Sequence, residues 1–190
     1  MLVLGSSLKD TAVMSLQTGT RLARVELPLI DPANLKIVAY AVDGPLLTDH
    51  PSYLATADIR EIGAIGMIID SNDELVALDD VIKFQKLHDL GFKLVGMQII
   101  DEHKRKLGKV SDYTVDTKSF VIQQMNVSRG FLQGINDTGL LVHRSQIVEI
   151  NDKAIIVKSG AKKSVEPVLE ATRHEYVNPF RTPAPEAETV

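Results

Sequence analysis

The chain has 190 residues with a formal net charge of −4; 44% of them are hydrophobic and none is cysteine. The length suits one or two domains, and the absence of cysteine excludes a disulfide framework and thiol chemistry. No window reaches the roughly 18 apolar residues that a membrane-spanning helix needs, and the opening residues are too few for a signal-peptide core. We therefore expect a soluble cytoplasmic protein.

The first third of the chain is predicted to form short strands separated by turns. Short segments rich in apolar residues predict strands at 12–16, 21–30, 35–42, 53–55, 59–62 and 66–69. The sequence Asp31-Pro32-Ala33-Asn34 is typical of a turn, and we expect Asp31 to cap it.

Residues 79–90 break this rhythm and predict a helix. Apolar residues recur there at every third position, which is typical of one helix face, at Val81, Phe84, Leu87 and Leu90. An aspartate can cap the start of the helix and Gly91 its end. We expect this helix to link two units of the fold, each a small β-barrel. It is expected to cover an open end of a barrel and to lie between the two barrels.

The remaining strands are predicted at 94–100, 106–115, 120–127, 139–142, 147–150 and 154–157. The pattern of residues 22–42 returns here 85 positions later, and seven pairs agree, six of them apolar: Leu22/Leu107, Val25/Val110, Ile30/Val115, Asp31/Asp116, Leu35/Phe120, Ile37/Ile122 and Val42/Val127. Gly108 predicts a bulge or bend in its strand, and Asp116 is expected to cap the second turn. The chain is therefore predicted to contain two copies of one small β unit.

These patterns predict a mainly β fold with two small β-barrels in tandem, joined by a short α-helix. The expected boundaries are 1–77 for the first barrel, 78–91 for the linker helix, 92–163 for the second barrel and 164–190 for a C-terminal tail. The proline content beyond residue 178 predicts disorder there. Val110 and Ile122 are expected to lie in the core.

Three features carry a resemblance to a known family: the glycine-bent strand from Leu107 to Asp116, the apolar strand at 120–127 and the closing run at 143–150. Their counterparts in the first copy lie at 21–31, 35–42 and 58–63. Both copies resemble the PRC-barrel, a small β-barrel found in the photosynthetic reaction-centre H subunit and at the C-terminus of ribosome maturation factor RimM. The resemblance covers residues 8–160 and implies two PRC-like barrels in tandem, as in bacterial proteins of unassigned function.

Charge is distributed unevenly between the copies. Residues 1–77 carry 5 Lys/Arg and 10 Asp/Glu, whereas residues 91–165 carry 12 Lys/Arg and 7 Asp/Glu. A basic cluster is predicted at the tip of the first hairpin of the second copy, and its candidate partner-binding residues are Lys104, Arg105, Lys106 and Lys109. Two interpretations stay open: a patch that binds an acidic protein or RNA phosphate, or a solvated turn. No aromatic residue interleaves with these cations, which favours a protein over nucleic acid.

No pattern of catalytic residues is present. The sequence contains neither a phosphate-binding glycine loop nor the HExxH and GxSxG motifs, and its five histidines do not have the spacing of a zinc site. We expect no catalytic residue, no metal, no cofactor and no enzymatic activity. The leading hypothesis is a binding or adaptor protein that uses tandem PRC-barrels for protein–protein interaction. The alternative is an RNA-processing or ribosome-associated factor that uses the basic second barrel.

Overall fold

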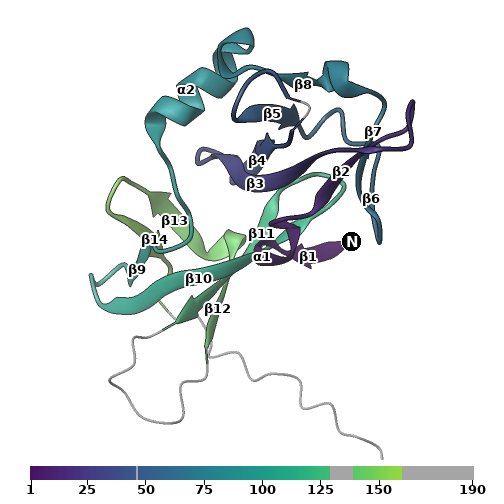
Figure 1. Cartoon of the computed structure of the whole chain (residues 1–190). Helices are drawn as coiled ribbons and strands as arrows, with labels where there is room; N and C mark the ends of the chain where they lie inside the picture. The colour runs from purple at the N-terminus through teal and green to yellow at the C-terminus, as the bar shows by residue number, and fades with distance from the viewer. Residues whose placement is uncertain (46, 129–138, 160–190) are drawn as a thin grey trace, which may run out of the picture.

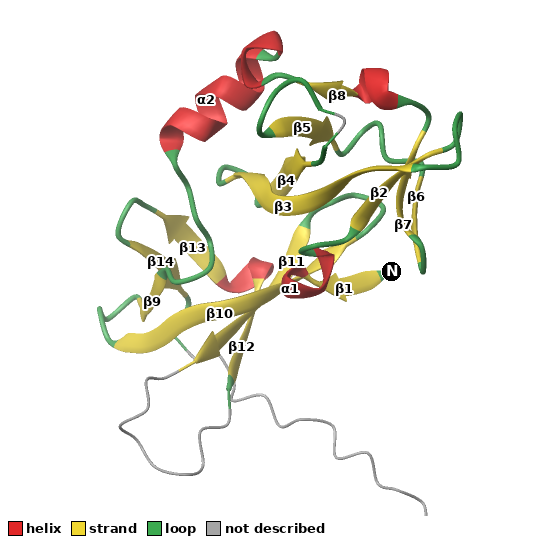
Figure 2. Cartoon of the chain, viewed as in Figure 1, coloured by secondary structure: helices red, strands yellow, loops and turns green. Residues whose placement is uncertain are grey.

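The computed structural model of the chain describes residues 1–45, 47–128 and 139–159, and the predicted C-terminal tail at 164–190 lies outside them (Figure 1). The described part consists mainly of strands, with one helix of more than two turns (Figure 2). This confirms the prediction of a mainly β fold. No helix in this part is both long and apolar enough to cross a membrane.

The first sheet contains seven strands in the order β6-β7-β2-β3-β4-β5-β8. The bounds are β2 Ala12–Ser15, β3 Arg21–Asp31, β4 Lys36–Asp43, β5 Ser52–Ala55, β6 Glu61–Gly63, β7 Gly66–Ile69 and β8 Leu75–Val76, with the 3-10 turn η1 at Asn72–Glu74. Strands β2 and β7 pair in parallel and the other neighbours are antiparallel. We call strands β2–β8 the first unit.

The second sheet repeats this order as β13-β14-β9-β10-β11-β12. The bounds are β9 Gln98–Asp101, β10 Lys106–Asp116, β11 Ile122–Ser128, β12 Leu140–His143, β13 Ile147–Ile150 and β14 Ala154–Val157, with the 3-10 turn η3 at Arg144–Gln146. Its one parallel pair, β9 with β14, corresponds to β2 with β7. We call strands β9–β14 the second unit.

The strand that follows the N-terminus does not belong to the unit in which the sequence placed it. β1 (Leu2–Leu4) pairs antiparallel with the end of β10, and Val3 lies opposite Val115. The short helix α1 (Gly5–Leu8) then leads back to β2 in the first unit. The predicted first barrel at 1–77 is therefore wrong for this segment, because three apolar residues reveal nothing about which distant edge they will pair with.

Pro32 explains why β1 pairs with the second unit and not with the first. The N–H of Thr117 donates to the carbonyl of Met1 at 2.9 Å. The matching position of the first unit, 85 residues earlier, is Pro32, which has no N–H to donate. The edge of β3 therefore cannot offer the hydrogen bond that holds β1 to β10, and proline is a common means of keeping a strand edge unpaired.

The two units are joined directly through their equivalent hairpin turns. The N–H of Ile37 donates to the carbonyl of Phe120, and the N–H of Ile122 donates to the carbonyl of Leu35, both at 2.8 Å. Leu35 and Phe120 both adopt a left-handed conformation, with φ of 53° and 55°. Since 35 and 37 match 120 and 122 at the offset of 85, the two hydrogen bonds are related by a pseudo-twofold axis.

One hydrophobic core runs through both units. Val110 and Ile122, which the sequence predicted as core, are 2% and 0% exposed and belong to the same buried cluster as Ile37 of the first unit. The ring of Tyr40 contacts that of Phe120 edge-on, with centroids 6.4 Å apart. The units therefore share their apolar interior across the hairpin turns.

The predicted helix exists but lies elsewhere. α2 (Ile82–Leu90) follows the 3-10 turn η2 (Leu78–Asp80) and ends at Gly91, whose φ is 63°. Phe84 is its buried residue and packs with the outer face of the first sheet, in a cluster with Leu29, Ala39, Ala41 and Tyr53. The prediction that the helix lies between the two units is wrong, because its apolar spacing identifies the buried face and not the surface that buries it (Figure 1).

The predicted bend and turn caps are present. Gly108 has φ of 146° at a register shift between β9 and β10. A side chain there would meet the carbonyl oxygen of Ser128, 2.4 Å from its Cβ. Asp31 accepts the N–H of Ala33, and Asp116 accepts that of Ser119, as turn-capping residues do.

Candidate protein-binding surfaces

The hairpin between β9 and β10 carries the predicted basic cluster. Its turn is organised by the buried carboxylate of Asp101, whose Oδ1 accepts the backbone N–H groups of His103 and Arg105, each at 2.9 Å. Oδ2 accepts Nε of Arg105 at 2.6 Å. Burial opposes ionisation of this carboxyl, but the hydrogen bonds from Arg105 and His103 outweigh it and hold the pKa of Asp101 below its usual value. The turn is therefore fixed by an ion pair.

The four predicted binding residues are exposed, but they are not equivalent. Arg105 is engaged by Asp101 and has a structural role. Lys104, Lys106 and Lys109 form no ion pair within the described residues. The hairpin thus presents Lys104 on the turn that Arg105 and Asp101 maintain, and Lys106 and Lys109 on the strand that follows it.

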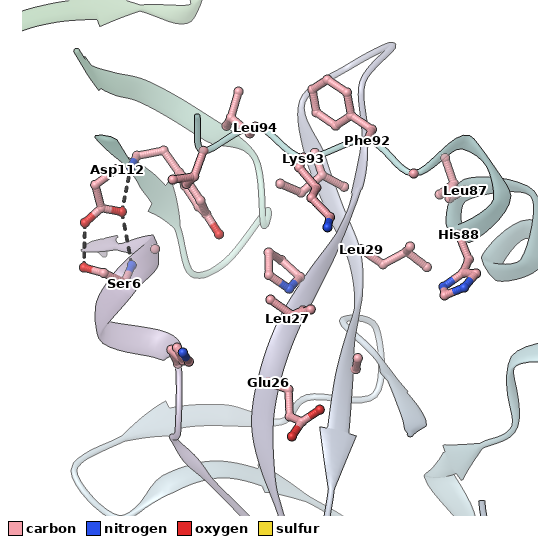
Figure 3. Close-up of a pocket in the computed structure, with 18 of the residues that line it drawn as sticks. Ser6, Glu26, Leu27, Leu29, Leu87, His88, Phe92, Lys93, Leu94 and Asp112 are labelled. Carbon is pink, nitrogen blue, oxygen red and sulfur yellow. Dashed lines mark hydrogen bonds between the residues drawn. The ribbon is translucent and has the colours of Figure 1, made fainter. Parts of the chain in front are cut away.

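A groove of about 580 Å³ lies where the two units meet. It is lined by β3, by the end of α2 with the linker that follows it, by α1 and by β10 (Figure 3). The sequence did not predict this groove, because its walls come from segments that are distant in the chain.

One wall of the groove is formed by α1 and β10. The N–H of Ser6 donates to Oδ1 of Asp112 at 3.1 Å, and its hydroxyl donates to Oδ2 at 2.5 Å (Figure 3). The N–H of Tyr113 also donates to Oδ1 of Asp112. Gly5 lies directly against the Tyr113 ring, where a Cβ would overlap the ring atoms. This wall is therefore close-packed and its carboxylate already has partners.

The opposite wall is formed by α2 and the first sheet. The hydroxyl of Tyr53 lies 3.1 Å from Nδ1 of His88, and the two rings are perpendicular. Burial raises the pKa of the Tyr53 hydroxyl. Leu29 and Leu87 lie beside His88 (Figure 3) and pack in the same cluster as Tyr53, so the wall is apolar with one polar contact.

Between the walls the groove is open. Leu27 of β3 is 61% exposed, although it lies next to buried Leu29 on the sheet. Lys93 reaches from the linker towards β3 (Figure 3), and Lys9 follows α1. Neither lysine forms an ion pair with any residue that the structure describes. The groove therefore combines an exposed apolar floor with two unpaired lysines and with Glu26, which also forms no ion pair among the described residues.

The described histidines and the turn aspartates do not assemble into a metal site. Among the described residues no three His, Cys, Asp or Glu side chains are placed to hold a metal ion. Asp31 pairs with Lys83 of α2 at 3.7 Å, and Asp116 pairs with the N-terminal ammonium at 3.2 Å. These carboxylates fasten α2 and β1 to equivalent ends of β3 and β10.

Comparison with known proteins gives a partial assignment. Residues 90–163 match the family model of the PRC-barrel domain. The match covers the second unit, whereas the first unit, with the same strand order, is not matched. No curated protein matches the chain. The part of the chain that forms the basic hairpin is therefore similar in sequence to the PRC-barrel domain.

Proposed function

We propose that the chain is a non-enzymatic binding module, built from two PRC-like barrels in tandem, whose basic hairpin recruits an acidic protein partner. The observation that carries the proposal is the set of three exposed, unpaired lysines, Lys104, Lys106 and Lys109, on a hairpin whose turn is fixed by Asp101. Cations on a preformed turn lose little conformational freedom when they bind. The PRC-barrel match over the same residues supports the interaction role.

The tandem arrangement is supported by the common strand order of the two sheets. It is also supported by the pair of symmetry-related hydrogen bonds between their turns. In this proposal the first unit is a second PRC-like barrel whose sequence has diverged beyond the reach of the family model.

The alternative is an RNA-processing or ribosome-associated function. The excess of Lys and Arg at 91–165 favours it, since basic surfaces bind phosphate backbones. The hairpin at 101–110 contains no Phe, Tyr or Trp on which a base could stack. This absence favours the protein partner.

A pull-down with the full chain tests both functions. Lysate is used with and without nuclease, at low salt, and wild type is compared with a Lys104→Glu, Lys106→Glu, Lys109→Glu variant. Arg105 is left in place because it holds the turn. The control is Lys86→Glu, Lys118→Glu, Lys153→Glu, which changes the net charge equally at exposed positions elsewhere.

We expect a protein partner that survives nuclease, is retained by the control and is lost from the hairpin variant. Exposed charges are screened over about 8 Å at physiological ionic strength, so binding should also weaken with salt. Loss of the partner after nuclease treatment would favour the RNA function. Retention by the hairpin variant would mean that the cluster is only a solvated turn.

A further inference from the structure

The groove between the units lies on their pseudo-twofold axis. Its lining contains matching residues of both copies: Glu26, Leu27 and Pro28 of β3 correspond to Ser111, Asp112 and Tyr113 of β10 at the offset of 85. The linker residue Gly91 likewise corresponds to Gly5 of α1, 86 positions earlier. The groove is therefore a space that both units enclose.

Different segments of the chain lie against the two halves of the groove. On the second unit, β1 pairs with the end of β10, and Asp116 binds the ammonium of Met1. On the first unit, α2 takes the equivalent place, and Asp31 binds Lys83. A helix that rests on the face of a sheet leaves the adjoining strand edge unpaired. The residues of β3 from Glu26 to Asp31 pair with β4 alone among the described strands.

Several residues of β3 differ from their counterparts on β10, and these differences determine the chemistry of the half of the groove beside the first unit. Asp112, which binds Ser6, is replaced by Leu27, and Tyr113, whose N–H donates to Asp112, is replaced by Pro28. The first unit has therefore lost the polar contacts of this position and presents apolar side chains. Since Pro28 and Pro32 have no N–H, an occupant must be held mainly by its side chains and not by pairing with the strand.

We propose that this groove binds an apolar segment of a protein partner that carries acidic residues. Leu27, 61% exposed, and Val95, 52% exposed, would be covered by apolar side chains. Lys9 and Lys93, which lack partners among the described residues, would pair with carboxylates. The volume of about 580 Å³ is within the range of sites that enclose a drug-sized ligand, which is comparable to a few side chains.

The inference rests on the proposed protein-binding function but uses a different surface. The lysines of the hairpin do not line the groove, and the residues of β10 that do line it, Ser111, Asp112 and Tyr113, follow these lysines in the strand. A substitution on one surface therefore leaves the other surface intact, so binding through each surface can be lost independently.

The test selects ligands without knowing the partner. A random 12-residue phage-displayed library is panned on the full chain, and the enriched peptides are synthesised with a fluorescent label. Their Kd is measured by fluorescence anisotropy on wild type, Leu27→Glu and Lys93→Glu. The matched controls are Leu16→Glu, whose side chain is also 61% exposed, and Lys153→Glu, which replaces an exposed lysine outside the groove and the hairpin.

We expect enriched peptides that combine apolar residues with Asp or Glu. Their affinity should fall at least tenfold in Leu27→Glu and about threefold to tenfold in Lys93→Glu, and it should stay within twofold in both controls. Thermal denaturation of each variant shows whether it is folded; Leu27 is exposed, so Leu27→Glu should melt within a few degrees of wild type.

Four results would overturn the proposal. They are the absence of enriched peptides, enrichment of basic peptides, equal binding to Leu27→Glu and wild type, and competition by another occupant of the groove. A synthetic peptide of residues 160–190 that displaces the selected ligand would assign the groove to the chain's own C-terminal segment. Self-association in sedimentation equilibrium that the selected peptide reverses would assign it to a second copy.

Discussion

Val110→Asp tests the shared core most directly. Val110 is 2% exposed, and its N–H and carbonyl bond to Met97 and Gly96, so the backbone cannot move the new side chain to the surface. The substitution removes a buried valine, worth about 1.5–3 kcal/mol. It also buries a polar group without a partner, which costs about 1–3 kcal/mol. We expect the free energy of unfolding to fall by about 3–6 kcal/mol.

This loss is large beside the total stability of about 5–15 kcal/mol that is usual for a folded protein. For a chain of this size it corresponds to a Tm lowered by about 10–20 °C. The measurement is thermal denaturation followed by circular dichroism, since the chain has no tryptophan. The control is Val148→Asp on β13, where the side chain is 53% exposed and the expected change is within about 0.5 kcal/mol.

Hydrogen exchange extends the test to the other unit. The N–H of Ile37 in the first unit donates to Phe120 in the second. If the core is shared, Val110→Asp should lower the protection of Ile37 as much as that of Ile122. An unchanged Tm would refute the buried position of Val110. Loss of protection confined to the second unit would refute the shared core.

Two further predictions concern single positions. Gly108→Ala should cost about 3 kcal/mol or more, because φ is 146° and the new Cβ would lie 2.4 Å from a backbone carbonyl. Gly19→Ala, with φ of 68° and open space around it, should cost about 1–2 kcal/mol, and urea denaturation separates the two. Hydrogen bonds from Ser119 and from the N-terminus lower the pKa of Asp116 to about 2 from 3.8. The stabilisation by its carboxylate is therefore present above about pH 4 and lost as the pH falls towards 2, and the Tm of Asp116→Asn should fall less than that of wild type across this window.

The repeated strands could be predicted because their apolar residues report directly on burial. β13 and β14 begin and end where the pattern predicted, and β3 and β10 differ by one residue at one end. Each of these strands has a face against the core, so periodicity and structure carry the same information. Gly108 was identified for a related reason, since only a special backbone conformation requires glycine in such a strand.

The site could be predicted only in part. The hairpin lysines lie close together in the sequence and are exposed as expected, but the role of Arg105 depends on Asp101, whose burial follows from the packing of β9. The groove depends on contacts between residues about 85 apart and on the path of the chain after α2. The sequence did contain one sign of the groove, because Leu27 is a leucine where the other copy has Asp112.

The pairing of β1 with the second unit can be tested at the turn position where the two units differ, which is Thr117 in the second unit and Pro32 in the first. Thr117→Pro removes the N–H that donates to Met1, and the backbone should accept it because Pro32 occupies the same place in the matching turn. Thr117→Val is the control, since it loses the hydroxyl contact with Met1 at 3.2 Å but keeps the N–H. We expect the amide of Val3 to exchange at least tenfold faster in the proline variant and to change little in the valine variant. Equal protection of Val3 in both would show that the apolar contacts of β1, and not this hydrogen bond, decide which unit it joins.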